Sequence, residues 1–259
     1  MSGLGPIPEY ERIILKSPQE IEKMRHSNRI VAEILEEMKV AAKAGVTTGE
    51  LDKLAQALLA KRNARSAFKG YNGYPAALCT SVNEEVIHGI PSERVLREGD
   101  ILSLDFGVIY DDYYGDAAIT LPIGRISAEA EQLLRVAEEA LYLGIDRARP
   151  GNRLLDISAA IQRHVESHGF SVVRDFVGHG IGKHLHEKPQ VPNFGDAGQG
   201  VRLKPGMTLA IEPMINAGSY EVIILGDGWT AVTKDKSLSA HFEHSVAVTE
   251  DGPHILSKI

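Results

Sequence analysis

Apolar residues recur at helical spacing in two stretches near the start of the chain. Over residues 17–44 they fall every three or four positions, which predicts a helix with one face packed on a core. Ser17 and Glu20 at its start match the Ser-x-x-Glu pattern of a capping box. A second capping signal at Thr48 predicts a helix that runs to about Arg62.

The second half of the chain repeats this order of elements. Helical periodicity returns from residue 127 to the Pro150-Gly151 break, and again from residue 154 to about residue 168. Both helical pairs are followed by short alternating runs typical of strands. The predicted strands lie at 78–82, 101–108 and 113–121 in the first half, and at 171–177, 207–215, 220–225, 229–233 and 242–248 in the second.

A repeated order of two helices and a run of antiparallel strands predicts an α+β fold with an internal duplication, not a parallel doubly wound sheet. The halves join near residue 125 with no linker between them, so we expect one compact domain over residues 17–259. Residues 1–16 are rich in Gly and Pro. We expect them to lie on the surface as a short arm.

Composition and charge exclude several classes of protein. Hydrophobic residues make up 43% and charged residues 24% of the chain, which is ordinary for a globular protein with a substantial core. The net charge of −7 argues against nucleic-acid binding by general electrostatics. The aliphatic runs fall far short of the roughly 20 residues of a membrane span, and the N-terminus lacks the pattern of a secretory signal. We therefore expect a cytoplasmic protein without membrane association.

Two carboxylates in the predicted hairpin are the first candidates for chemistry. Asp105 ends the run Ile-Leu-Ser-Leu, the chain turns through Gly107 and Asp111-Asp112, and Asp116 follows on the partner strand. If both side chains point the same way, cross-strand neighbours lie about 5 Å apart. Two such anions repel unless they share a proton or a cation. The pair is therefore a proton-sharing dyad, a metal site, or two solvated turn carboxylates.

Three more candidate ligands stand in the second half. His179 lies in a glycine-flanked histidine cluster, Glu212 interrupts an apolar run before Pro213, and Glu243 lies in a β-prone run. Each alone has an ordinary explanation, since a histidine beside glycines is more often a loop residue and a lone glutamate can face solvent from a strand. Glu212 is the hardest to explain in that way, because its apolar neighbours leave little sign of a solvated face. A buried carboxylate needs a partner.

Together, the four carboxylates and the one imidazole suit two divalent cations. Four negative charges against four positive ones make the cluster neutral, which removes most of the cost of burying it. Oxygen donors with one nitrogen favour Mn²⁺, Fe²⁺, Co²⁺ or Zn²⁺. Because Cys79 is the only cysteine, a cysteine-based zinc site is excluded. Two cations about 3.5–4 Å apart can bind one hydroxide and polarise a carbonyl, which is hydrolytic chemistry.

The ordered motifs strongly resemble those of the type I methionine aminopeptidases, within the wider pita-bread metallopeptidase family M24. They are Tyr71-Asn-Gly-Tyr with the segment up to His88, Asp105-Phe-Gly with Asp116, Gly-His179-Gly-Ile-Gly with His186-Glu, Ile-Glu212-Pro, and Ser-Ala-His-Phe-Glu243-His. The resemblance runs from about Ser17 to the C-terminus. It implies the pita-bread fold, a pseudo-twofold unit of duplicated helices and strands around a curved antiparallel sheet.

The resemblance also implies a role for each motif residue. It implies five metal ligands: Asp105 on one cation, His179 and Glu212 on the other, and Asp116 and Glu243 bridging both. It implies three catalytic residues: Glu212 as proton acceptor from metal-bound water, with His88 and His186 hydrogen-bonding the scissile peptide. It implies a narrow methionine pocket lined by Tyr71, Tyr74, Cys79 and Trp229, next to His88 and His186.

The implied reaction is removal of the initiator methionine from nascent proteins, with a small second residue preferred and a metal-bridging hydroxide as the nucleophile. The implied cofactors are two divalent cations per chain, drawn from Co²⁺, Mn²⁺, Fe²⁺ and Zn²⁺. The implied partners are nascent polypeptide N-termini, met at the ribosome. We expect no direct nucleic-acid contact and a monomer.

Two positions depart from the family pattern. His241 stands where the family usually has Gln, and strand alternation places it on the side of Glu243. It is either a hydrogen-bonding partner of the ligands or a tolerated change, and we favour the tolerated change. His184-Leu185 replaces a stretch that often reads Gly-Phe, which changes the edge of the pocket.

Three rival interpretations share the same scaffold. The first is another pita-bread peptidase, an Xaa-Pro aminopeptidase or a prolidase, which usually carries an additional N-terminal domain. The second is a non-catalytic binding protein, and the third is a creatinase-like hydrolase that uses no metal. The five intact ligand positions argue against the second and the third.

Overall fold

The computed structural model describes residues 12–259, so most of the surface arm predicted over residues 1–16 lies outside the described residues. Within this range the chain forms four α-helices, in the places that the hydrophobic pattern predicts. They are α1 (Pro18–Ala41), α2 (Thr48–Lys61), α3 (Ala128–Arg147) and α4 (Leu154–Ser167). No helix of residues 12–259 is long and apolar enough to cross a membrane.

The helix starts follow from local side-chain chemistry. Ser17 and Glu20 form the predicted capping box of α1, in which each side chain accepts a hydrogen bond from the other residue's backbone N–H. The same box opens α2, but its cap is Thr47 and not Thr48, because Glu50 lies three residues after Thr47. Thr48 is the first helical residue.

The strands form one nine-stranded sheet and two three-stranded sheets, and every pairing between them is antiparallel. The large sheet has the order β1-β4-β5-β14-β9-β7-β8, with β2 on β4 and β15 on β14. Its strands are β1 (Arg65–Ser66), β2 (Cys79–Val82), β4 (Ile101–Tyr110), β5 (Tyr113–Pro122), β7 (Gly178–Gly180), β8 (Glu187–Val191), β9 (Thr208–Ile211), β14 (Glu243–Thr249) and β15 (Gly252–Ile255). The small sheets are β13 (Ser239–His241), β10 (Met214–Asn216) and β6 (Ser171–Val172), and β11 (Val222–Ile224), β12 (Ala231–Thr233) and β3 (Glu85–Ile87).

The predicted hairpin forms the longest strand pair, β4 and β5, joined by the two-residue turn Asp111-Asp112. Both turn residues have a positive φ, of 49° and 62°, as a type I′ turn requires. Gly107, which we expected in the turn, instead lies within β4, where a Cβ would come within 2.5 Å of the Phe68 ring. Close packing against that ring accounts for the glycine.

The strand predicted over residues 207–215 is two strands, because the chain leaves the large sheet and enters a small one at Glu212-Pro213. β9 ends at Ile211 and β10 begins at Met214. Pro213 has no N–H to donate to a ladder, which favours this break. The chain changes sheets in the same way at Phe242, between β13 and β14.

The glycine-rich histidine segment is more regular than predicted. Of the strand expected over residues 171–177 only β6 forms, and His179 lies within β7 and not in a loop after a strand. The pattern also predicts none of β1, β3, β8, β13 and β15. These strands have two to five residues, too few to show a clear alternation, and β8 buries the charged Glu187.

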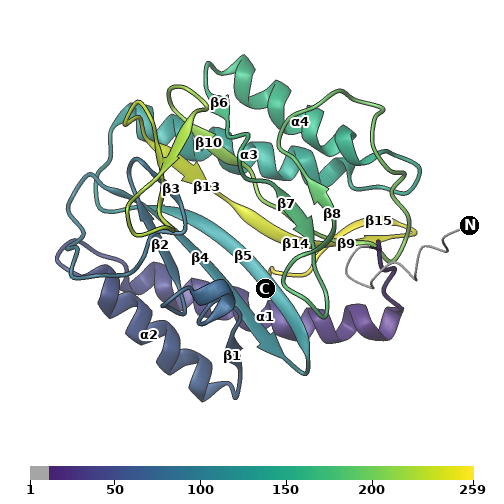
Figure 1. Cartoon of the computed structure of the whole chain (residues 1–259), viewed down its shortest axis with the longest axis horizontal. Helices are drawn as coiled ribbons and strands as arrows, with labels where there is room; N and C mark the ends of the chain where they lie inside the picture. Colours follow the sequence, from purple (N-terminus) through teal and green to yellow (C-terminus); the bar gives the residue numbers. More distant parts are fainter. Residues whose placement is uncertain (1–11) are drawn as a thin grey trace, which may run out of the picture.

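The helices pack on one face of the large sheet and leave the other face for the site. Leu102, Leu104 and Phe106 alternate along β4 and join the core under α1 and α2. Leu209 on β9 and Val246 on β14 join the core under α3 and α4. In Figure 1 the pair α1–α2 lies along the lower edge of the strands and the pair α3–α4 along the upper edge. The predicted α+β class and its duplicated order of helices and strands are confirmed.

Helix α1 approaches β5 closely at Gly115, where a Cβ would come within 2.7 Å of the Asn28 backbone nitrogen. Helix backbone cannot rotate away, so Gly115→Ala forces the helix and the strand apart. We expect this change to lower the free energy of unfolding by about 1–3 kcal/mol, measured by urea denaturation. Gly226→Ala is the matched control, since a Cβ there meets nothing within 4 Å. Wild-type stability of Gly115→Ala would contradict the close approach.

Candidate metal centre

Register across the large sheet brings three of the four candidate carboxylates onto one face. Asp105 on β4 lies opposite Ala118 on β5, and Ala118 lies opposite Glu243 on β14. Asp116 is two residues from Ala118 on β5, so it points to the same face. Asp105 and Asp116 are therefore diagonal neighbours and not the directly opposite pair that the hairpin suggested, since Asp116 lies opposite Gly107.

The other two candidate ligands come from strands farther along the same face. His179 on β7 lies opposite Ala210 on β9, and Ala210 lies opposite Ser245, two residues from Glu243. Glu212 directly follows β9, and its Oε1 lies 3.4 Å from His179 Nε2. Antiparallel register and side-chain alternation thus gather all five residues from five separate segments.

The donor atoms of this cluster fit a divalent cation. Ligand atoms of Asp116, His179 and Glu243 all lie within 4.8 Å of one another, and all three residues are buried. Among residues 12–259, three carboxylate oxygens of the cluster are buried without a hydrogen-bond partner: Asp105 Oδ1, Asp116 Oδ1 and Glu243 Oε1. Buried acceptors need a partner, and a cation between them would supply it.

A backbone contact orients His179 for ligation. Its Nδ1 lies 2.9 Å from the Gly180 carbonyl oxygen. Because a carbonyl only accepts hydrogen bonds, Nδ1 carries the proton and Nε2 presents a lone pair toward Glu212. This is the arrangement of metal-binding histidines, whose other ring nitrogen donates to a carbonyl or a carboxylate.

The electrostatics of the cluster favour added positive charge. Burial raises the pKa of Asp105 to about 7. Burial first, and then repulsion within the cluster, raises the pKa of three other carboxyls well above the usual range: Asp116, Glu212 and Glu243. Burial lowers the pKa of His179 to about 3, so the imidazole stays neutral at neutral pH. The carboxyls retain protons that a divalent cation would displace.

A cavity of about 170 Å³ opens onto the cluster. Every residue predicted to bind metal, to act in catalysis or to bind substrate lines it, and three further residues join them. The predicted residues in the lining are Tyr71, Tyr74, Cys79, His88, Asp105, Asp116, His179, His186, Glu212, Trp229 and Glu243, and the further ones are Phe68, Asn72 and Leu185. No motif indicates a role for Phe68 or Asn72; the only local signal is that both lie within three residues of Tyr71.

Two histidines stand beside the cluster with aromatic neighbours. His88 has a positive φ of 60°, a strained conformation for a residue with a side chain, and its ring lies edge-on to Trp229. Burial lowers the pKa of His88 to about 4, so it is neutral at neutral pH. The His186 ring centroid lies 4.3 Å from that of His179, and its Nδ1 is 2.6 Å from the Tyr71 hydroxyl.

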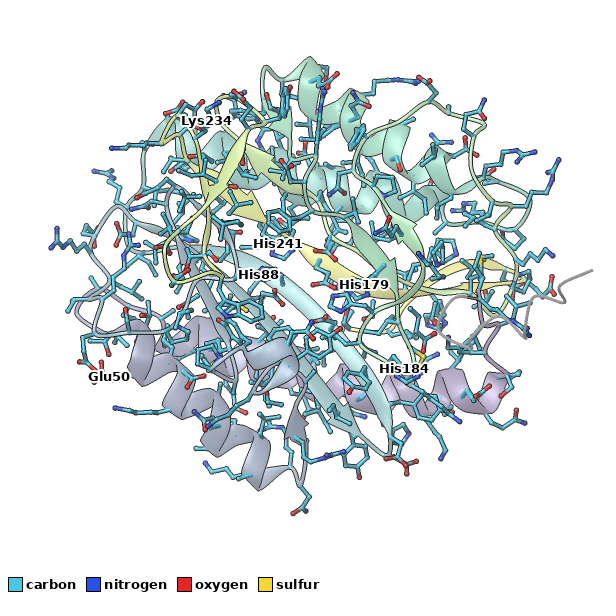
Figure 2. The ribbon with its side chains drawn as sticks, in the orientation of Figure 1. Glu50, His88, His179, His184, Lys234 and His241 are labelled. Atoms are coloured by element: carbon cyan, nitrogen blue, oxygen red, sulfur yellow. The ribbon has the colours of Figure 1, made fainter. Side chains whose placement is uncertain are left out.

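His241 lies deeper in the same region. Figure 2 shows His88, His179 and His241 close together near the centre of the molecule, with His184 farther out. His241 Nε2 is 3.7 Å from Glu212 Oε2, while His179 approaches the other oxygen of that carboxylate. Neither ring nitrogen of His241 has a hydrogen-bond partner within the described part of the chain. Two imidazoles therefore flank Glu212, a long-range contact that strand alternation alone does not predict.

An antiparallel sheet that places four carboxylates and an imidazole beside a small cavity defines the class of the protein, a metal-dependent hydrolase of the pita-bread fold. The chain belongs to metallopeptidase family M24, whose model matches residues 22–250. The methionine aminopeptidase of Clostridium acetobutylicum is 55% identical over 246 residues, which cover 95% of this chain and 98% of the relative. Methionine aminopeptidase 1 of Bacillus subtilis is 53% identical over 247 residues, which cover 95% and 100%. The resemblance inferred from the motifs is confirmed.

Solved structures bear out the fold. The crystal structure of methionine aminopeptidase from Rickettsia prowazekii matches with a TM-score of 0.94 at 42% identity, covering 95% of this chain and 100% of that one. The methionine aminopeptidase from Thermotoga maritima gives a TM-score of 0.94 at 48% identity, covering 96% and 100%. The Xaa-Pro dipeptidase from Bacillus anthracis is 22% identical with a TM-score of 0.76, and the match covers 95% of this chain but 62% of that one. At that identity, the likeness to the Xaa-Pro dipeptidase shows a common fold and supports no statement about activity.

The raised pKa values predict a pH dependence of cation binding. Protons compete for the same oxygens, so we expect the affinity for Mn²⁺ to fall as the pH is lowered from about 8 to about 6, by about tenfold per pH unit for each proton displaced. The direction of this change in affinity follows from Asp105, because its pKa of about 7 makes the carboxyl increasingly protonated below neutral pH. Titration calorimetry of metal-stripped protein measures both the affinity and the protons released. A constant affinity without proton release would contradict this electrostatic assignment.

Proposed function

We propose that the chain removes the initiator methionine from nascent proteins as a metal-dependent aminopeptidase. The observation that carries this proposal is a small cavity whose lining combines the carboxylate cluster with aromatic side chains. At about 170 Å³ the cavity is smaller than the roughly 300–1,000 Å³ of common ligand pockets, which suits one terminal side chain. The curated relatives, named methionine aminopeptidase, support methionine as that side chain.

The proposal includes two divalent cations, which would neutralise the four carboxylates. Asp105 would hold one, His179 and Glu212 would hold the other, and Asp116 and Glu243 would contact both. Bound cations lower the pKa of water and polarise a carbonyl, which is the chemistry that peptide hydrolysis needs. Oxygen donors with one nitrogen favour Mn²⁺, Fe²⁺, Co²⁺ or Zn²⁺.

The chain's own residues would orient the peptide and accept a proton. Glu212, whose pKa is raised by burial and by its carboxylate neighbours, would take the proton from the attacking water. Burial lowers the pKa of His88 and of His186, so both imidazoles are neutral and can donate an N–H to the scissile peptide. The Tyr71 hydroxyl, 2.6 Å from His186 Nδ1, would donate to that nitrogen and leave the proton on Nε2.

The methionine side chain would lie against the aromatic wall, where sulfur contacts with rings are favourable. The rings of Tyr74 and Trp229 meet edge to face with centroids 5.1 Å apart, and the Tyr74 hydroxyl donates to two backbone carbonyls. Cys79 lies opposite Asp105 in the sheet and is buried. Burial raises the pKa of the Cys79 thiol well above its usual value, so it would serve as part of the wall and not as a nucleophile.

We propose that residues 17–259 act as one catalytic unit, a cytoplasmic monomer that meets nascent N-termini at the ribosome. The division of the cluster supports a single unit. Asp105 and Asp116 come from the first half of the chain, whereas His179, Glu212 and Glu243 come from the second half. Neither half alone would hold the cluster.

The proposal predicts a clear order of peptide substrates. With Mn²⁺ added, we expect free methionine to be released from Met-Ala-Ser, and about 100-fold more slowly from Met-Phe-Ser, because a confined site penalises bulk at the second residue. We expect no release of alanine from Ala-Pro peptides. Chromatographic measurement of the free amino acids gives the three rates. Cleavage of Ala-Pro without release of methionine would assign the chain to the Xaa-Pro peptidases instead.

A further inference from the structure

Lys16 and Glu187 form an ion pair that is almost completely enclosed. Their side chains are 4% and 1% exposed. Over residues 12–259, no other ion pair of a lysine or an arginine has both side chains buried. Burying two charges is unfavourable unless geometry and hydrogen bonds compensate. A pair retained at that cost makes its surroundings a candidate for a functional role.

The segment that carries Lys16 is attached to the fold through its backbone. The Lys16 N–H donates to the Gly206 carbonyl at 2.7 Å. Three residues earlier, Ile13 forms a parallel bridge with Lys188, the neighbour of Glu187. Two backbone contacts therefore fix the segment, so the position of Lys16 does not depend on the Glu187 side chain alone.

The loop over residues 182–187, whose last residue begins β8, is shaped around the same pair. The second carboxylate oxygen of Glu187 accepts a hydrogen bond from the His184 N–H at 3.2 Å. A Cβ at Gly182 would come within 2.4 Å of Lys16 Cε and 2.6 Å of Glu187 Oε1. Only glycine leaves room for the ion pair at this position, so the loop and the pair fit each other.

The loop also carries part of the cavity wall. Leu185 and His186 line the cavity, and the His186 ring reaches His179 and the Tyr71 hydroxyl. His186 directly precedes Glu187 in the chain, so the position of Glu187 fixes where the His186 backbone lies. A shift of Glu187 would therefore displace His186 relative to the metal cluster.

We propose that Lys16 is a positioning residue for the substrate: its pairing with Glu187 holds the loop over residues 182–187 so that Leu185 and His186 keep their places at the cavity. This inference rests on the proposed function, in which His186 hydrogen-bonds the scissile peptide. Lys16 is neither in the cavity lining nor in the group of candidate metal ligands. It acts on the substrate through the loop.

Three variants test this role: Lys16→Met, Glu187→Gln and the double variant. Each single change removes one charge of the pair, so we expect the loop to shift and kcat for Met-Ala-Ser to fall by about 10- to 100-fold. The affinity for Mn²⁺ should stay unchanged, because no candidate ligand lies in the loop. The double variant should be no slower than the slower single variant, since both changes act through one contact.

Lys23→Met is the matched control, because it removes a lysine from a pair with Asp111 whose side chains are 49% and 57% exposed. It should leave kcat unchanged. Wild-type rates in both single variants, or losses that multiply in the double variant, would overturn the inference. A loss of Mn²⁺ affinity in parallel with kcat would also overturn it, since that indicates a general structural role. If Lys16→Met does not fold, Glu187→Gln carries the test, because its amide oxygen still accepts from His184.

Hydrogen exchange separates this inference from the proposed function. Residues 182–187 should exchange faster in Lys16→Met than in Lys23→Met, whether or not the protein releases methionine. Equal exchange in the two variants would refute the positioning role. Absence of methionine release by the metal-loaded wild-type protein would refute the proposed function alone.

Discussion

Mutual repulsion among four carboxylates is the constraint on which the rest of this structure depends. Asp105, Asp116 and Glu243 lie on one face of adjacent strands, and Glu212 joins them from the end of β9. Only a rigid frame keeps such charges together, and antiparallel register over ten-residue strands provides it. The hydrophobic cores on the opposite face tie that frame to the helices. Burial raises the pKa values of all four carboxyls, repulsion adds to this shift at Asp116, Glu212 and Glu243, and the cluster therefore favours divalent cations.

The chain changes sheets at two places, and these two places form part of the active region. At Glu212-Pro213 and at Phe242 the chain passes from the large sheet to a small one, and the two crossings contact each other through the Phe242 N–H and the Pro213 carbonyl. Glu212 lies at the first crossing and His241 immediately before the second. Because the strand pairing is interrupted there, the Glu212 carboxylate lies between two imidazoles, with His179 near one oxygen and His241 near the other. The candidate proton acceptor, Glu212, thus lies where the regular strand pairing is interrupted.

Much of the fold and the candidate site could be predicted from the sequence, because it depends on neighbours a few residues apart. The Ser17–Glu20 capping box, the Asp111-Asp112 turn and the alternation around Asp105 are local of this kind. The rest depends on partners that are distant in sequence. The sequence pattern does not predict β8, because its buried Glu187 pairs with Lys16, which is 171 residues away in the chain. The diagonal placement of Asp116, the approach of His241 to Glu212 and the presence of Phe68 in the cavity wall likewise follow only from the assembled sheets.

The most direct test of the central claim is the release of free methionine from Met-Ala-Ser by metal-stripped protein as Mn²⁺ is added back, beside an Asp105→Ala variant. We expect no release without the cation, a rate that rises to a plateau within about two equivalents per chain, and no release by the variant. Full activity of the stripped protein, or a wild-type chain that binds no divalent cation, would contradict the assignment of the carboxylate cluster as the catalytic metal centre.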